Sequence, residues 1–230
     1  MKILVVTDEE YPAFYESYQP GRLDGYDLII SCGDLKASYL TFLSDMSHCP
    51  VLYVHGNHDT AYRKCPPGGC DCIDDKVVVY NGVRILGLGG CRWYHPGEYQ
   101  VTERAMRRRI RKLRFPLWRA RGIDLVVTHA PPEGVGDAED PAHRGFAALR
   151  ALLEKYHPAY LLHGHVHLSY GADKSREREY AGTRVINCYQ HYELEIADKP
   201  HDLRRHGSLI WKNGEPEYEP EYGRRDSNGF

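Results

Sequence analysis

Residues 28–34 read Leu28-Ile29-Ile30-Ser31-Cys32-Gly33-Asp34, an apolar run that ends in a glycine and a carboxylate. Short runs of aliphatic and β-branched residues are typical of strands buried in a sheet. Four further runs also end in a potential metal ligand: Asp8, Asn57, His129, and His165 with His167. In α/β proteins, the binding site lies at the carboxyl ends of the strands of the sheet. We therefore expect these side chains, far apart in sequence, to converge in space.

The converging side chains are carboxylates, an amide and imidazoles, which suit hard and borderline divalent cations. Two cations close together need one ligand that both share. Asp34 is the candidate, because a carboxylate has two oxygens and offsets the repulsion between cations. His165 and His167 lie on the same side of an extended segment, since side chains alternate with period two. The pattern predicts a binuclear metal site with the ligands Asp8, Asp34, Asn57, His129, His165 and His167.

These segments resemble the motifs of the calcineurin-like metallophosphoesterases, which are Asp-x-His, Gly-Asp, Gly-Asn-His-Asp/Glu, a lone His, and Gly-His-x-His. Four of the five match outright, in the same order, between residues 8 and 167. The resemblance implies a metal-dependent phosphoric ester hydrolase with a four-layer αββα sandwich of two mixed β-sheets flanked by helices. Segments 128–146 and 182–187 are similar to the branch of small bacterial phosphoesterases and 239-type phosphodiesterases, which implies phosphodiester substrates, cyclic nucleotides among them.

The first motif departs from the family pattern, because it reads Asp8-Glu9-Glu10 and places Glu10 where the family has a histidine. A carboxylate at this position would bind the first metal and favour oxygen-seeking ions such as Mn²⁺ or Mg²⁺ over zinc. Alternatively, Glu10 holds a metal-bound water, or the first metal is lost. We expect ligation by Glu10, directly or through water, beside Asp8, Asp34 and His167.

The resemblance also implies a mechanism. Two cations about 4 Å apart would polarise the phosphoryl group and make hydroxide available for in-line attack on phosphorus. His58 is our candidate for the general acid that protonates the leaving group, with Asp59 orienting its ring. Asn57, His58, Asp137 and His143 are predicted to contact the substrate. For Asp137 and His143 an ordinary polar loop that caps the next helix is the alternative.

Periodicity predicts the remaining elements. Helices are expected at residues 39–46 and 146–153 from their i, i+3, i+4 apolar spacing, and an arginine-rich helix at 102–121 with Thr102 as N-cap. Asn81-Gly82 predicts a tight hairpin between two strands. Segments 183–189 and 208–211 are further strands. We expect one domain over 1–230, with a motif core at 1–190 and a polar extension at about 191–230 that is extended or weakly ordered.

Composition and charge limit the kinds of partner and the cellular compartment that we expect for this protein. A formal charge of −2 over 230 residues gives no hint of a general nucleic-acid partner, and the arginine-rich helix is interpreted first as a solvated face. The first apolar run has only the length of a strand, so we expect no membrane span and a cytoplasmic protein. The seven cysteines are expected to be reduced. Cys65, Cys70 and Cys72 cluster, but Cys-x-Cys with no fourth ligand nearby is poor zinc spacing.

The sequence therefore predicts a phosphodiesterase that uses two divalent ions and acts on a small-molecule or nucleotide phosphoester. Manganese is the favoured ion, with iron, zinc and magnesium as alternatives. Three other functions remain open: a phosphomonoesterase or protein phosphatase, a nuclease that uses the arginine-rich helix, and a non-catalytic scaffold with an impaired first metal site. The oligomeric state is left open.

Overall fold

The computed structural model describes residues 1–168, 175–197, 210–212 and 215–217. Its larger helices are α1 (Ala37–Met46), α2 (Glu103–Lys112), α3 (Arg114–Arg119) and α4 (Ala147–Tyr156). Its strands are β1 (Lys2–Thr7), β2 (Leu28–Ser31), β3 (Val51–Tyr53), β4 (Cys70–Cys72), β5 (Lys76–Tyr80), β6 (Val83–Leu88), β7 (Cys91–Arg92), β8 (Gln100–Val101), β9 (Leu125–Thr128), β10 (Tyr160–His163), β11 (Glu177–Tyr180), β12 (Thr183–Asn187), β13 (Gln190–Glu195), β14 (Ile210–Lys212) and β15 (Glu215–Glu217).

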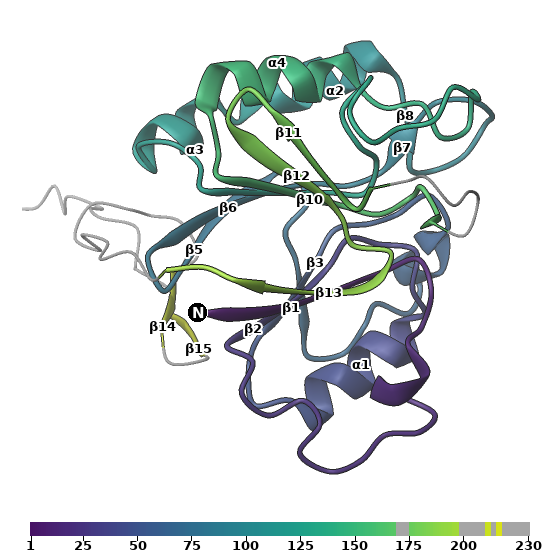
Figure 1. Cartoon of the computed structure of the whole chain (residues 1–230), viewed down its shortest axis with the longest axis vertical. Helices are drawn as coiled ribbons and strands as arrows, with labels where there is room; N and C mark the ends of the chain where they lie inside the picture. The colour runs from purple at the N-terminus through teal and green to yellow at the C-terminus, as the bar shows by residue number, and fades with distance from the viewer. Residues whose placement is uncertain (169–174, 198–209, 213–214, 218–230) are drawn as a thin grey trace, which may run out of the picture.

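Two large mixed sheets are stacked between helices, which confirms the predicted four-layer arrangement (Figure 1). The first sheet has the order β13-β1-β2-β3-β4 and carries α1 on its outer face. The second has the order β11-β12-β10-β9-β6-β5-β14-β15, and α2, α3 and α4 cover its outer face. A separate pair, β7 and β8, lies beside the second sheet.

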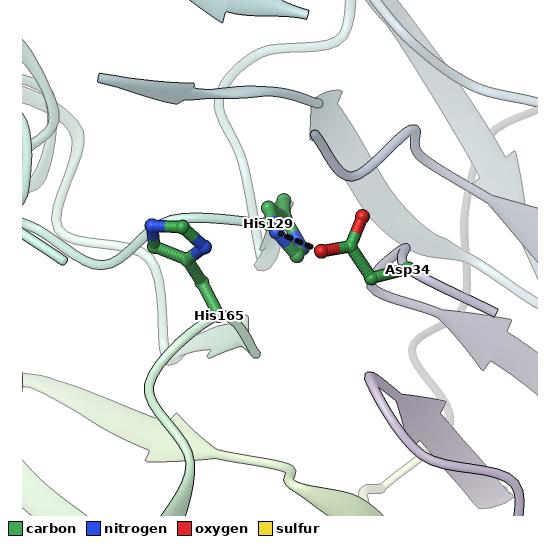
Figure 2. A group of neighbouring side chains, drawn as sticks. All are labelled: Asp34, His129 and His165. Carbon is green, nitrogen blue, oxygen red and sulfur yellow. Dashed lines mark ion pairs between the residues drawn. The ribbon is translucent and has the colours of Figure 1, made fainter. Parts of the chain in front are cut away.

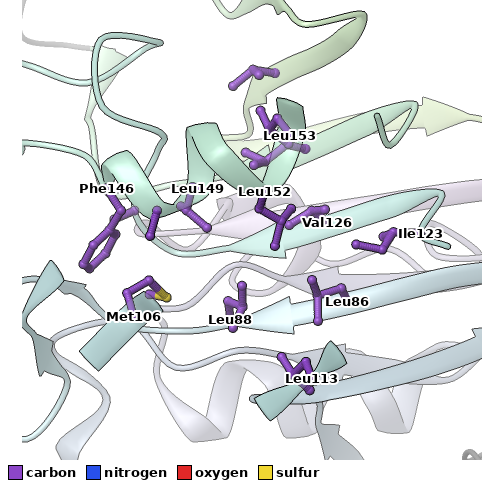
Figure 3. Packing of buried hydrophobic residues seen from close by; sticks show 14 of the residues in the cluster. Leu86, Leu88, Met106, Leu113, Ile123, Val126, Phe146, Leu149, Leu152 and Leu153 are labelled. Atoms are coloured by element: carbon purple, nitrogen blue, oxygen red, sulfur yellow. The ribbon is translucent and has the colours of Figure 1, made fainter. Parts of the chain in front are cut away.

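Strand alternation divides the apolar side chains among three cores. Ile3 and Val5 of β1 face the core between the two sheets, whereas Leu4 and Val6 face α1. In the second sheet, Leu162 points into the inter-sheet core and its neighbour Leu161 points towards the helices. Figure 3 shows this helix-side core, where Met106, Leu149 and Val126 pack together. Strands β1, β2, β9 and β10 are buried on both faces, as expected for strands covered on both sides.

The central strands are parallel, so their carboxyl ends meet at one edge. β1 pairs in parallel with β2, and β2 with β3. In the other sheet β9 pairs in parallel with both β6 and β10. Helix α1 connects β2 to β3, and α4 connects β9 to β10, as the sequence predicts for crossover helices. The segments that follow β1, β2, β3, β9 and β10 carry the predicted metal ligands.

Several local predictions are confirmed. The Asn81-Gly82 turn has positive φ at both residues and joins the antiparallel strands β5 and β6, as a type I′ hairpin requires. Thr102 caps α2 by accepting a hydrogen bond from the Ala105 amide at 3.2 Å. Among the described residues, no helix has the length and apolar character needed to cross a bilayer.

Two predictions differ from the structure. The single helix expected at 102–121 is divided at Leu113 into α2 and α3, because Pro116 lacks the N–H that would continue the helical hydrogen bonds. The polar extension expected from residue 191 begins inside β13, which pairs antiparallel with the whole of β1. Strand β14 overlaps the strand predicted at 208–211, of which residues 208 and 209 lie outside the described residues.

Candidate metal centre

Three predicted ligands from three different strand ends converge in one cluster. The ligand atoms of Asp34, His129 and His165 all lie within 4.8 Å of one another. Figure 2 shows the three side chains as neighbours, with the ring of His129 between Asp34 and His165. His129 Nε2 lies 3.2 Å from Asp34 Oδ2 and 3.0 Å from Asn57 Oδ1. Four of the predicted ligands of the second metal, Asp34, Asn57, His129 and His165, are therefore brought together.

Backbone carbonyls orient the two imidazoles. His129 Nδ1 lies 2.8 Å from the Cys32 carbonyl oxygen, so that nitrogen carries the proton and Nε2 faces Asp34 and Asn57. His165 Nε2 donates to the Ala142 carbonyl at 2.7 Å, which leaves Nδ1 as its ligand atom. A second hydrogen bond of this kind is typical of metal-binding histidines. The sequence does not predict the role of these two carbonyl groups, because every residue has one.

The donor set fits a divalent cation. With its proton on Nδ1, His129 presents a lone pair on Nε2 to two further acceptors, the oxygens of Asp34 and Asn57. Acceptors that face one another require a cation between them, either a proton on Nε2 or a metal ion in its place. His129 is fully buried and His165 is 6% exposed, so water does not satisfy these groups. Carboxylate, amide oxygen and imidazole suit manganese, iron, zinc and magnesium to different degrees.

The charges of the cluster follow from burial and pairing. Burial opposes ionisation of both Asp34 and His129, but their mutual attraction outweighs it. The pKa of Asp34 is lowered to about 2, and the pKa of His129 is raised to about 9. Burial and the neighbouring positive His129 lower the pKa of His165 to about 3. Near neutral pH, Asp34 is therefore anionic and His165 is a neutral imidazole, the forms in which these side chains bind metals.

The first metal site is assembled only in part. His167 Nε2 lies 3.9 Å from Asp8 Oδ1, and the His167 ring packs on Tyr189 at 4.8 Å between centroids. The Asp8 carboxylate accepts the His165 amide on both oxygens, at 2.9 and 3.0 Å. Its side chain is 1% exposed, and burial raises its pKa. Asp8 thus connects the end of β1 to the segment that carries both histidines.

Glu10 lines the cleft that also contains Asp8 and Asp34. Its Oε1 lies 3.3 Å from Lys36 Nζ in an ion pair. The cleft is lined by Asp8, Glu9, Glu10, Glu16, Asp34, Lys36, His58, Asp59 and Tyr62, among others. Direct ligation by Glu10 and ligation through water both stay predictions. For direct ligation, the Glu10 side chain would have to leave Lys36.

His58 and Asp59 occupy different positions in the site. The backbone N–H of His58 donates to Asp34 Oδ1 at 2.7 Å, and the exposed residue lines the cleft. Asp59 is 3% exposed, and its Oδ2 accepts the backbone amides of Gly56 at 2.7 Å and Asp34 at 3.0 Å. Burial raises the pKa of Asp59 to about 6. These contacts make Asp59 a brace between the two ligand loops, and its predicted role in orienting the His58 ring stays a prediction.

Asp137 and His143, the predicted substrate contacts in the loop after β9, also differ in their positions. Asp137 accepts the Gly134 amide on Oδ1 at 2.9 Å and the Gly145 amide on Oδ2 at 3.0 Å. Asp137 thus braces its own loop, whereas no side chain caps α4, and contact of Asp137 with the substrate stays a prediction. The His143 ring lies 5.2 Å from the His165 ring and bonds to Asp140 through Nδ1. His143 therefore borders the cluster, whereas Asp137 braces the loop that brings it there.

Three glycines allow the ligand loops to approach this closely. A Cβ on Gly33 would lie 2.3 Å from the Gly56 nitrogen, and one on Gly56 would lie 2.1 Å from Asp34 Oδ1. A Cβ on Gly164 would lie 2.1 Å from Thr7 Oγ1. Side chains at these positions would force the ends of β1, β2, β3 and β10 apart. Asn187, which sequence reasoning did not assign to the site, adds a further brace by donating to the Val166 carbonyl at 2.7 Å.

Comparisons with known proteins agree with this geometry. The family model described as calcineurin-like phosphoesterase matches residues 1–169. UPF0046 protein T07D4.2 of Caenorhabditis elegans is 32% identical over 133 residues, which cover 56% of this chain and 31% of that protein. UPF0046 protein K07C11.7 of the same organism is 25% identical over 180 residues, or 63% of this chain and 58% of that protein. The chain thus spans less than two thirds of the length of either relative.

Solved structures share the fold. The crystal structure of TT1561 of Thermus thermophilus superposes with a TM-score of 0.58 at 16% identity, covering 82% of this chain and 89% of that one. A second crystal structure gives a TM-score of 0.62 at 15% identity, over 84% of this chain and 94% of that one. At such identities the likeness concerns the fold alone. The family model, together with the ordered ligands at the strand ends, shows that this chain belongs to the calcineurin-like phosphoesterase family.

Proposed function

We propose that this protein is a phosphodiesterase that uses two divalent ions, manganese first among them, with His58 as the general acid. The observation that carries the proposal is the convergence of Asp34, His129 and His165 from three strand ends. Bound metal ions supply Lewis-acid activation of the phosphoryl group and of water. The scaffold alternative gives no reason for this buried, carbonyl-oriented ligand set. The seven free cysteines suit a reducing compartment, so we place the protein in the cytoplasm.

The protein's own residues have separable tasks in this proposal. Asp34, Asn57, His129 and His165 would hold one ion, and Asp8, Asp34, His167 and Glu10 would hold the other. The bond from the His58 backbone amide to Asp34 fixes the backbone at His58 next to this predicted ligand, and the exposed side chain lines the cleft. From there it donates a proton to the departing alkoxide. Lys36, exposed at the rim of the cleft, can attract the phosphate charge.

The charge of the cleft favours a diester over a monoester. Glu9 and Glu16, two carboxylates that the proposal does not assign to the ions, line it together with Lys36. A phosphomonoester is close to a dianion at neutral pH, whereas a diester carries one negative charge. Repulsion from the lining carboxylates therefore disfavours the monoester more strongly. The arginine-rich face of α2, which a nuclease would use, lies on the outer side of the second sheet beside α4 (Figure 1).

The test is hydrolysis of bis-p-nitrophenyl phosphate and p-nitrophenyl phosphate by metal-stripped protein reloaded with Mn²⁺, Mg²⁺, Zn²⁺ or Fe²⁺. We expect metal-dependent turnover with a higher kcat/KM for the diester, and loss of turnover in Asp34→Asn. His48→Ala, in an exposed segment after α1, is the matched control for the His58→Ala variant described below. Turnover of the monoester alone would establish a phosphatase. No turnover with any ion, by folded protein that binds metal, would contradict the proposal.

The role of His58 is tested by changing the leaving group. Nitrophenolate departs without a proton, whereas an alkoxide requires one. His58→Ala is therefore expected to lower kcat by about 10²–10⁴-fold for an alkyl leaving group and by much less for nitrophenolate. An equal loss for both leaving groups would show that His58 positions the substrate and does not donate the proton.

A further inference from the structure

A second group of metal-ligand side chains lies apart from the centre described above. His55 follows β3, Cys72 ends the neighbouring strand β4, and Asp74 lies two residues beyond it. The ligand atoms of these three residues all lie within 4.8 Å of one another. In the sequence, the Cys65, Cys70 and Cys72 cluster has poor spacing for zinc because no fourth ligand lies near it. The fold brings His55 to this position through the parallel pairing of β3 with β4.

Cys72 and Asp74 both approach the same nitrogen atom of His55, Nδ1. His55 Nδ1 lies 2.7 Å from Asp74 Oδ2 and 3.7 Å from Cys72 Sγ. In a Cys-His-Asp catalytic triad, the thiol and the carboxylate use opposite nitrogens of the imidazole. Here both face Nδ1, so the arrangement does not activate the thiol as a nucleophile. Convergence of a thiol, an imidazole nitrogen and a carboxylate oxygen on one point is instead the geometry of chelation.

The surroundings hold two of these groups in place. Asp74 Oδ1 accepts the Gly89 amide at 2.7 Å, which leaves Oδ2 for His55. The His55 ring is stacked on Tyr99 with 4.5 Å between centroids and 12° between planes. The side chains of His55 and Asp74 are 14% and 20% exposed, so the cluster is accessible to ions and water without being a surface pair. Ligands fixed by such contacts lose little freedom when a metal binds.

We propose that His55 Nδ1, Cys72 Sγ and Asp74 Oδ2 form a separate binding site for a zinc-class cation, with a fourth position open to water. A thiolate together with an imidazole selects a borderline or soft ion over the hard ions that suit the oxygen-rich centre. On binding, Cys72 loses its thiol proton to solvent, and His55 binds through Nδ1 as a neutral imidazole whose ring proton is on Nε2.

The site is placed to stabilise the loop that carries Asn57 and His58. His55 directly precedes Gly56, and its carbonyl accepts the Gly90 amide at 2.7 Å. A bound cation would tie this loop to the segment after β4 and raise the resistance of both to unfolding, because binding to the native state alone stabilises it. The inference does not depend on the proposed phosphodiesterase activity.

Cobalt binding to the metal-stripped 230-residue protein tests the site. A Co²⁺–thiolate bond gives an intense near-ultraviolet charge-transfer band, and the Asp34, His129 and His165 cluster contains no thiol. We expect the wild-type protein and Asp34→Asn to show the band, and Cys72→Ser and His55→Ala to lose it. Cys70→Ser, in the same strand, is the matched control and should retain it. Absence of the band from wild-type protein at saturating Co²⁺, or its persistence in Cys72→Ser, would overturn the proposal.

A second measurement avoids substitutions altogether. Metal-stripped wild-type protein is alkylated with iodoacetamide with and without Zn²⁺, and the labelled peptides are quantified by mass spectrometry. Zn²⁺ is expected to slow labelling of Cys72 by at least about tenfold and to leave the exposed Cys65 unaffected. Equal labelling of Cys72 in both conditions would contradict a zinc–thiolate bond.

Discussion

Replacing Gly164 with alanine is expected to damage the centre without replacing any of the predicted ligands. The added methyl group would lie 2.1 Å from Thr7 Oγ1 and 2.4 Å from Asp8 Oδ2. Neither neighbour can move freely, because Thr7 is fully buried and the Asp8 side chain is 1% exposed. Thr7 is further held by hydrogen bonds to Asp8 and to the Gly33 carbonyl.

The magnitude follows from these distances. Ordinary contact with a Cβ begins near 3.4 Å, so the end of β1 and the histidine segment must separate by about 1.3 Å, a displacement of the size that costs about 10²-fold in catalysis. Overpacking of a buried site also lowers the free energy of unfolding by about 1–3 kcal/mol. We expect Gly164→Ala to bind less metal and to lose about 100-fold in kcat/KM for bis-p-nitrophenyl phosphate.

The assay combines kcat/KM, metal content and the thermal midpoint of unfolding. Gly68→Ala is the matched control, because a methyl group there meets Thr41 Cγ2 at an ordinary 3.4 Å. A Gly164→Ala protein with the metal content of the control and a kcat/KM within about threefold of wild type would refute the argument from close packing.

Three further predictions concern braces and core. Asn187→Ala removes the bonds to the Val166 carbonyl and the Tyr189 amide, so metal affinity measured by titration calorimetry should fall by about 10–100-fold; unchanged affinity would show that the histidine segment holds its own shape. Leu162→Ala opens the inter-sheet core, where Leu162 is fully buried, and should cost about 2–5 kcal/mol in urea unfolding; Met46→Ala, at 39% exposure, is the control and should change little. Burial raises the pKa of Glu133, but its bonds to Arg92 and Arg144 hold it below the ordinary 4.5. Ionised Glu133 therefore stabilises the fold above about pH 4.5, and this stability is lost as the pH falls through the lowered pKa. The thermal midpoint of wild type should drop more on acidification than that of Glu133→Gln, and parallel curves would contradict the assignment.

Local patterns in the sequence were sufficient to predict the ligand-bearing strands, the crossover helices and the order of the ligands. Strand alternation and helical periodicity are properties of neighbouring residues, and so is the Asn81-Gly82 turn. The end of the motif core was placed at residue 190, before β13, because this strand depends on a distant partner. The Gln190–Glu195 segment is stable as a strand because β1 offers it a whole antiparallel edge, which its own composition does not reveal.

Contacts between distant segments are decided only by the tertiary structure. The sequence determined that Asp34, His129 and His165 are ligand types at strand ends, and their order indicated the family. It did not show that the Cys32 and Ala142 carbonyls orient the rings, that Asp59 braces two loops, or that Glu10 pairs with Lys36. Nor did it place His55 beside Cys72 and Asp74. Backbone groups are the same in every residue, so their use as partners depends on how the strands pair and how closely the glycine loops pack.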